Sequence, residues 1–216
     1  MKNLSIAFSL LFVANLVTAQ GDQDAVDVSY IIGHQIGTSL DQFKNEIDRD
    51  VLIQALRDGI DGKESRFSQE ESAKKQSSFF QSLQQRQGLD NLATAESFLA
   101  ENGKKEGWTT TASGLQYKVL TPGDGAQPTD EDTVTVHYIG TFMDGKEFDS
   151  SVSRGEPATF PLTGVIKGWT EGLQLMKLGS KFRFAIHPDL GYGPTGNRGI
   201  PPNSALLFDV ELISIK

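Results

Sequence analysis

The sequence predicts an α+β protein, with an all-α N-terminal region, a long connecting helix, and a C-terminal antiparallel half-barrel sheet wrapped on one short helix. Apolar residues recur at intervals of three and four through the first hundred residues, which is the period of amphipathic helices. Beyond residues 103–107 apolar residues alternate with polar ones, as in strands with one buried face. This change of period separates the two regions.

Residues 1–19 have the composition of a secretory signal peptide. Lys2 supplies a positive start, residues 4–17 are nearly all apolar, and residues 17–19 resemble a cleavage site. The apolar stretch is too short to span a bilayer comfortably, and the polar run after Ala19 disfavours the alternative, a signal anchor. The sequence therefore predicts an exported protein, with the periplasm as its compartment and outer-membrane association or secretion as other destinations.

Charge and composition exclude several classes of function. The chain has 216 residues and a net charge of −8, and loss of the leader removes Lys2 and no acid, which makes the charge −9. An acidic chain repels phosphate backbones, so we expect no nucleic-acid partner. The chain has no cysteine, and its three histidines are far apart in the sequence. We therefore expect no metal and no cofactor. No stretch after the leader is long and apolar enough to span a bilayer, so we also expect no membrane span in the mature form.

Three helices are predicted in the N-terminal half. Residues 28–43 and residues 51–60 each carry apolar side chains at helical spacing, and Gly62 follows the second run as a stop signal. A capping-box pattern at residues 68–71 begins a long polar helix that extends to about Asn102 and loosens near Gly88.

The first two helices predict a dimer. Two short helices and one polar helix bury too little surface to form a core alone, and about thirty-five helical residues span roughly 50 Å. We therefore expect residues 20–67 to form a symmetric dimerisation domain, residues 68–106 a linker helix, and residues 107–216 a separate domain. The alternative for the N-terminal part is a loose helical extension.

The C-terminal domain shows four alternating runs and one helix. The helix extends from Ile166 to about Leu175, and Trp169 lies on its apolar face. A curved sheet around this helix leaves a concavity at the helix N-terminus, with Trp169 as its floor. The alternating apolar residues are Leu115, Tyr117 and Val119; Val134, Val136 and Tyr138; Phe182, Phe184 and Ile186; and Leu206, Phe208, Val210 and Leu212.

Several short motifs follow one another between about Gly114 and the C-terminus. They are residues 136–140, 144–151, 165–172, 186–188, 190–193, 200–203 and 207–212. In their order and spacing this part of the chain closely resembles the FKBP-type peptidyl-prolyl cis-trans isomerases. The N-terminal helices and the leader resemble the exported, dimeric macrophage-infectivity-potentiator branch of that family.

The resemblance implies a proline pocket in which Trp169 lies under the pyrrolidine ring. It implies that the Ile166 N–H and the Tyr192 hydroxyl bind substrate carbonyls, that Ile200 overhangs the pocket on a loop, and that Arg154 lies near Asp149. The implied catalytic residues are Asp149, Tyr192, Trp169 and Phe208, and the implied substrate-binding residues are Tyr138, Phe148, Arg154, Val165, Ile166 and Ile200.

Two positions depart from the family pattern. Ala158 stands where an aromatic wall residue is common, and Asn197 replaces a frequent histidine. These departures affect ligand preference more than the reaction. We expect an isomerase that rotates Xaa-Pro bonds in unfolded or partly folded exported proteins, and the resemblance implies that macrolide inhibitors can bind the pocket. The alternative function is a dimeric holdase chaperone with isomerisation secondary.

Overall fold

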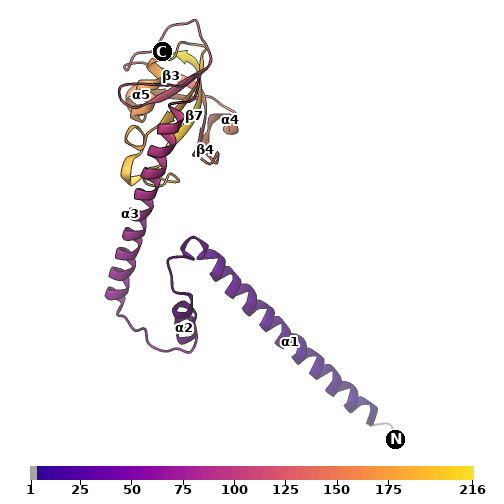
Figure 1. Cartoon of the computed structure of the whole chain (residues 1–216). Coiled ribbons are helices and arrows are strands. Elements are labelled where there is room, and N and C mark those ends of the chain that lie inside the picture. Colours follow the sequence, from indigo (N-terminus) through magenta and orange to yellow (C-terminus); the bar gives the residue numbers. More distant parts are fainter. Residues whose placement is uncertain (1–3) are drawn as a thin grey trace. The chain divides into compact units, whose positions relative to one another are not determined.

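The computed structural model describes residues 4–216, which divide into two compact units that meet between Ser68 and Gln69. The first unit contains α1 (Leu4–Ser39), a 3-10 turn (Asp41–Phe43) and α2 (Arg49–Ile60). The second unit contains the long helix and the sheet. Figure 1 gives the order of the elements along the chain.

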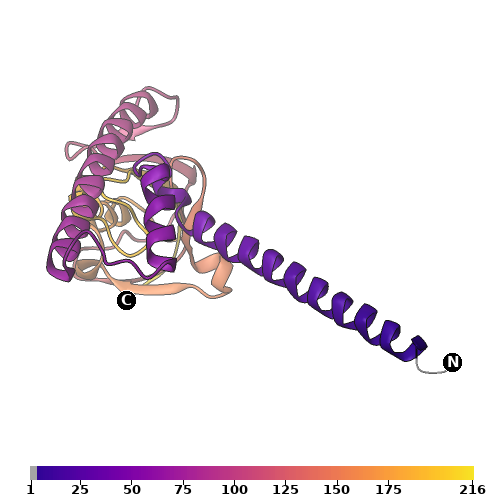
Figure 2. The ribbon, with the colours of Figure 1, turned by 90° about the horizontal axis from the view of Figure 1, so that it is seen from below.

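The first predicted helix is longer than expected at its N-terminal end. Residues 28–43 were expected to be helical, whereas α1 is continuous from Leu4 (Figure 2). No proline separates the apolar leader from residue 28, so nothing in this stretch ends the helix. The predicted leader, residues 1–19, lies partly outside the described residues, and its cleavage after Ala19 stays a prediction.

Helix α2 confirms the predicted second helix. The Asp48 carboxylate caps it by accepting hydrogen bonds from the N–H groups of Asp50 and Val51, at 3.0 and 3.1 Å. Gly62 follows the helix with a φ of 71°, as suits a residue just past a helix end. Among the described residues, no helix combines the length and the apolar character needed to cross a bilayer.

The long helix α3 (Gln69–Asn102) begins at the predicted capping box, and it does not loosen at Gly88. Its second half packs on the sheet, where Ala95 and Leu99 are buried. The buried Asn102 donates from its amide to Gln116 Oε1 at 2.9 Å, and Gln116 donates to the Leu99 carbonyl at 2.8 Å. The segment predicted as a linker therefore packs about half of its length against the sheet, and all of α3 belongs to the second unit.

The sheet is antiparallel, in the order β1-β2-β6-β7-β3-β4, with β5 also paired to β3. The four predicted runs lie in strands, except that Leu115 immediately precedes β2. Three short strands were not predicted, because two to four residues are too few to show alternation. The strands are β1 (Thr109–Thr110), β2 (Gln116–Thr121), β3 (Thr133–Thr141), β4 (Glu147–Ser150), β5 (Ala158–Pro161), β6 (Lys181–Ile186) and β7 (Leu206–Ile215).

One edge of β3 is shared by two strands. Strand β5 pairs with residues 133–136 and β4 with residues 139–141, so neither strand pairs with Tyr138. There the buried Ser151 hydroxyl takes the place of a partner strand, because it accepts a hydrogen bond from the Tyr138 N–H at 2.8 Å. The chain leaves the sheet at this point and forms a four-residue helix, α4 (Ser151–Arg154). The prediction of a single helix in the C-terminal domain was therefore wrong.

Helix α5 (Lys167–Gln174) packs into the concave face of the sheet, as predicted. It lies close to β6 because Gly172 has no side chain: a Cβ there would lie 2.7 Å from Phe184. Trp169 and Leu173 point into the core, which also contains the inward residues of β3, β6 and β7. The N-terminal end of α5 is left at the mouth of a pocket.

Candidate active site

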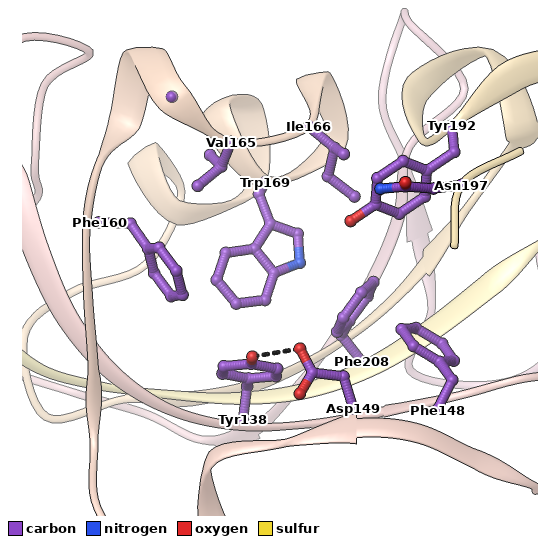
Figure 3. Close-up of a pocket in the computed structure, with 11 residues that line it drawn as sticks. Tyr138, Phe148, Asp149, Phe160, Val165, Ile166, Trp169, Tyr192, Asn197 and Phe208 are labelled. Carbon is purple, nitrogen blue, oxygen red and sulfur yellow. Dashed lines mark hydrogen bonds between the residues drawn. The ribbon is translucent and has the colours of Figure 1, made fainter. Parts of the chain in front are cut away.

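A pocket of about 460 Å³ opens beside the N-terminus of α5 (Figure 3). Six of its lining residues are aromatic, and Asp149 is its only ionised acid. The pocket therefore combines a wide apolar wall with one charged corner. The lining residues are Tyr138, Phe148, Asp149, Phe160, Gly164, Val165, Ile166, Trp169, Tyr192, Asn197 and Phe208.

The indole of Trp169 forms the centre of the aromatic wall. The rings of Tyr138, Phe208 and Phe160 meet it edge-to-face, with centroids 5.1, 5.2 and 5.7 Å away and interplanar angles of 87°, 79° and 87°. Phe148 meets Phe208 at 5.5 Å and 90°. Edge-to-face contacts hold each ring in a defined orientation. The Trp169 side chain is buried, and its N–H has no hydrogen-bond partner in the described part of the chain.

Asp149 is the acceptor of a three-residue polar network at the edge of the wall. The Tyr138 hydroxyl donates to Asp149 at 2.5 Å, and Arg154 donates to the other carboxylate oxygen. Arg154 also donates to the Tyr138 hydroxyl at 2.9 Å, and its guanidinium lies 5.6 Å from the centroid of the Tyr138 ring. The network orients both partners and leaves the carboxylate charge compensated.

The network keeps each member in one protonation state. Burial alone would raise the pKa of Asp149, but hydrogen bonds from Tyr138 and Arg154 outweigh it and lower that pKa. Burial, followed by the bond to Asp149, raises the pKa of the Tyr138 hydroxyl. At neutral pH, Asp149 is therefore an anion and Tyr138 a neutral donor.

The opposite side of the pocket carries Tyr192 and Asn197. Both belong to the segment between β6 and β7, and Figure 3 shows the Tyr192 hydroxyl directed toward the pocket, beside Asn197. Burial and the charge of Asp149 raise the pKa of Tyr192, while a hydrogen bond with the Asn197 side chain opposes the rise. The hydroxyl is thus a neutral hydrogen-bonding group across the pocket from the Asp149 network.

Val165 and Ile166 lie where the chain enters α5. A 3-10 turn (Leu162–Gly164) precedes them, and Ile166 is the N-cap residue of α5, with an extended backbone of φ −62° and ψ 150°. The Ile166 carbonyl accepts from the N–H of Trp169 at 2.9 Å. The short turn and the helix start therefore fix both side chains at the pocket mouth.

The structure brings eight of the ten predicted site residues into the pocket wall. Arg154 reaches the pocket only through Asp149 and Tyr138, and Ile200 is buried in the core cluster, 8 % exposed, without lining the cavity. Whether these residues act as assigned stays a prediction. Within residues 4–216, no group of three or more His, Cys, Asp or Glu side chains could hold a metal ion.

Sequence reasoning missed Phe160 as a wall residue. Ala158 was noted as lacking the expected ring, but Phe160 lies two residues further along β5, on the same face of the strand, and contacts Trp169. The alternation of β5 could have identified it. Gly164 was also missed, and Asn197 was noted only as a departure from the family pattern.

Comparisons with known proteins agree with this geometry. Residues 125–213 match the family model of the FKBP-type peptidyl-prolyl cis-trans isomerase, and residues 25–119 match that of the domain amino terminal to it. The chain is 42 % identical over 205 residues to the FKBP-type peptidyl-prolyl cis-trans isomerase FkpA of Aeromonas hydrophila, covering 90 % of this chain and 76 % of that protein.

Two further relatives cover most of both chains. Identity to the outer membrane protein MIP of Legionella longbeachae is 39 % over 201 residues, which is 89 % of this chain and 86 % of that protein. The crystal structure of FkpA from Escherichia coli superposes with a TM-score of 0.74 at 39 % identity, covering 90 % of this chain and 95 % of that one. With its aromatic pocket, its sheet wrapped on α5 and these relatives, the chain belongs to the FKBP-type peptidyl-prolyl cis-trans isomerases.

Proposed function

We propose that the aromatic pocket rotates Xaa-Pro bonds without covalent chemistry, with the proline ring seated on Trp169. The observation that carries this proposal is the pocket wall itself: six aromatic side chains surround one carboxylate whose charge is already compensated by Arg154. Such a site suits a neutral ring better than a charged group. In this assignment the Ile166 N–H and the Tyr192 hydroxyl bind the carbonyls on either side of the ring.

The reaction requires only that the twisted amide be favoured over the planar one. The rotational barrier of about 18–20 kcal/mol comes from amide resonance, so no bond breaks and no nucleophile is needed. The twisted amide has lost resonance and carries less charge on its carbonyl oxygen, so an apolar wall penalises it less than the planar form. Donors placed for the twisted geometry bind it more tightly than the ground state, and this difference lowers the barrier.

This mechanism predicts a flat pH profile. The pKa of Asp149 is lowered and the pKa values of Tyr138 and Tyr192 are raised, so none of the three changes protonation between about pH 5 and about pH 9. We expect kcat/KM for a proline tetrapeptide, measured in a protease-coupled assay, to stay constant across this range. A bell-shaped profile centred near neutrality would instead indicate an essential proton transfer.

The stability contributed by Asp149 follows a different pH dependence. A lowered pKa in the folded state means that this contribution is present above the unfolded pKa and is lost as pH falls through the folded value. Tyr138 and Tyr192 have raised pKa values, so the stability that their neutral hydroxyls contribute is present below the unfolded pKa. It is lost in the alkaline range, as pH rises through the folded values. The expected losses of stability therefore fall outside the window in which activity is constant.

We also propose that the N-terminal helices form a homodimer. In the single chain, α1 and α2 expose apolar side chains at helical spacing, and this amount of apolar surface favours a partner. A second copy of the chain carries the same apolar surface, and a two-fold symmetric dimer would bury the two surfaces against each other. The exposed residues are Val28, Ile31, Ile32 and Ile36 on α1 and Val51, Leu52, Leu56 and Ile60 on α2.

A charge on the apolar face of α2 should separate the dimer. We expect the mature protein to have the mass of two chains by light scattering, and Leu56→Lys to shift it toward the mass of one chain at micromolar concentration, because burying an unpaired ammonium is costly. Gln54→Lys places the same charge on an exposed polar position of the same helix and should leave the mass unchanged. A wild-type protein with the mass of one chain would remove the dimer from the proposal.

The proposed setting is outside the cytoplasm, with unfolded exported proteins as substrates. The composition of residues 1–19 supports export. The Legionella longbeachae relative is named an outer membrane protein, which also supports a location outside the cytoplasm. The name of the Aeromonas hydrophila relative, a peptidyl-prolyl cis-trans isomerase, supports isomerisation as the primary activity, so the holdase alternative takes second place. Mass measurement of the mature protein from a periplasmic extract, with Gln20 as its first residue, tests the export proposal.

A further inference from the structure

Helix α3 contacts the loop between β6 and β7, residues 187–205, which we call the pocket loop because Tyr192 and Asn197 in it line the pocket. Gly88, in the middle of the helix, is buried, and a Cβ built on it would lie 3.3 Å from Cβ of Pro202. The helix backbone and this loop therefore approach closely because position 88 has no side chain. The end of the helix is anchored separately, by the Asn102–Gln116 pair on β2.

Two side-chain amides join the helix to the loop at this point. Asn91 donates from Nδ2 to the Pro202 carbonyl at 2.8 Å, and Asn203 donates from Nδ2 to the Gly88 carbonyl at 3.0 Å. Both hydrogen bonds are partly buried, and they run in opposite directions between the two segments. We call Asn91 and Asn203 the amide clamp.

The clamp continues into the pocket wall through the backbone of the loop. The N–H of Asn203 donates to the carbonyl of Gly193 at 2.9 Å, and Gly193 directly follows Tyr192. Within the loop, Asn197 and Ile200 exchange two backbone hydrogen bonds of 2.9 and 2.8 Å. A hydrogen bond thus joins the clamp to the residue next to Tyr192, and the Asn197–Ile200 pair holds the same loop, whose Tyr192 and Asn197 side chains form one side of the pocket.

The pocket loop contains several residues with unusual backbone conformations. Gly193, Gly196 and Gly199 all have positive φ, and Asn203, at φ 52°, is the only residue other than glycine with positive φ in the described chain. Glycines give the unrestrained segment many alternative backbone conformations, and ordering them costs conformational entropy. Hydrogen bonds from a rigid helix reduce those alternatives.

We propose that the amide clamp positions the pocket loop, which makes Asn91 and Asn203 positioning residues for the isomerase reaction and α3 a part of the catalytic unit. The inference rests on the proposed function in one respect, the binding role of the Tyr192 hydroxyl. It assigns a catalytic task to a helix that lies outside the pocket wall and packs on the sheet.

Two variants each remove one donor of the clamp: Asn91→Ala leaves the sequence of the loop unchanged, whereas Asn203→Gly also adds a glycine to it. Asn91→Ala removes one donor and leaves a good helix former in α3. Asn203→Gly removes the other donor and keeps the left-handed backbone at that position. Thr94→Ala is the matched control, because Thr94 lies one turn from Asn91 and its hydroxyl donates only to the Asp90 carbonyl of its own helix.

The test measures kcat and KM separately on a proline tetrapeptide, with the full mature chain and well below the unfolding temperature. We expect each clamp variant to lower kcat/KM about three- to tenfold, the equivalent of one net hydrogen bond, and Thr94→Ala to match the wild type. Clamp variants within twofold of the wild type would overturn the inference. An inactive wild type would instead refute the proposed function, so the two failures are distinguishable.

A double-mutant cycle distinguishes positioning from general stability. If Asn91 acts through Tyr192, Asn91→Ala should have little further effect on kcat/KM in a Tyr192→Phe background. A loss in the double variant equal to the product of the two single losses would overturn the proposed route. Hydrogen exchange supplies a direct readout. The backbone amides of Ile200 and Asn203 should exchange faster in Asn91→Ala than in the wild type, and at the wild-type rate in Thr94→Ala.

Discussion

Asp149→Asn is expected to lower kcat/KM by about tenfold to a hundredfold while the protein stays folded. The substitution keeps the shape of the side chain but replaces one acceptor oxygen by a donor, which then faces the Tyr138 hydroxyl or the Arg154 guanidinium. The Tyr138 ring and its neighbours in the wall lose their fixed orientation as a result. Losses of this size are typical when one preorganised polar group is removed from an active site.

The matched control is Asp144→Asn on the same hairpin. Asp144 is an acid in the turn between β3 and β4, and its carboxylate accepts from the Lys146 N–H at 2.9 Å, which an asparagine oxygen can also do. We expect this variant to retain wild-type kcat/KM, with circular dichroism unchanged in both proteins. Equal activity in the two variants would mean that the Asp149 network has no part in the reaction.

The parts of this fold with a repeating pattern could be predicted from the sequence, and the parts made by tertiary contacts could not. The alternation of Phe182, Phe184 and Ile186 identifies β6, because these side chains are buried on one face of the strand. The spacing of Leu52, Leu56 and Ile60 identifies α2, whose apolar face is exposed in the single chain. Strands β4 and β5 have four residues each, so they show too few alternations to be recognised.

The site could be predicted as far as the family motifs extend. These motifs identify Trp169, Asp149 and Tyr192, but Phe160 lies beside a position that departs from the pattern, and so it was missed. Gly88 shows the same limit for α3. In the sequence a glycine in a polar helix indicates a weak point, whereas in the structure it is the contact that admits Pro202. Only the folded neighbour distinguishes these two interpretations.

Gly140→Ala should damage the pocket more than any other single methyl group added to the sheet face. Gly140 lies in β3 opposite Asp149 of β4 and Phe208 of β7. A Cβ there would lie 2.8 Å from Phe148 Cζ and 2.8 Å from Phe208 Cε1, which is closer than carbon atoms approach without displacement. Because both rings line the pocket, at least one of them has to move.

The expected result is a loss of kcat/KM greater than about tenfold, since small displacements of positioning groups have large effects on rate. Overpacking should also lower the free energy of unfolding by about 1–3 kcal/mol, measured by denaturant titration. Gly59→Ala in α2 is the control. No atom other than those of the adjacent helix backbone lies within 4 Å of its added Cβ, and a helical alanine gains up to about 1 kcal/mol over glycine. Unchanged activity and stability in Gly140→Ala would mean that Phe148 and Phe208 can move apart freely, and an aromatic wall that loose could not hold a proline ring in one orientation.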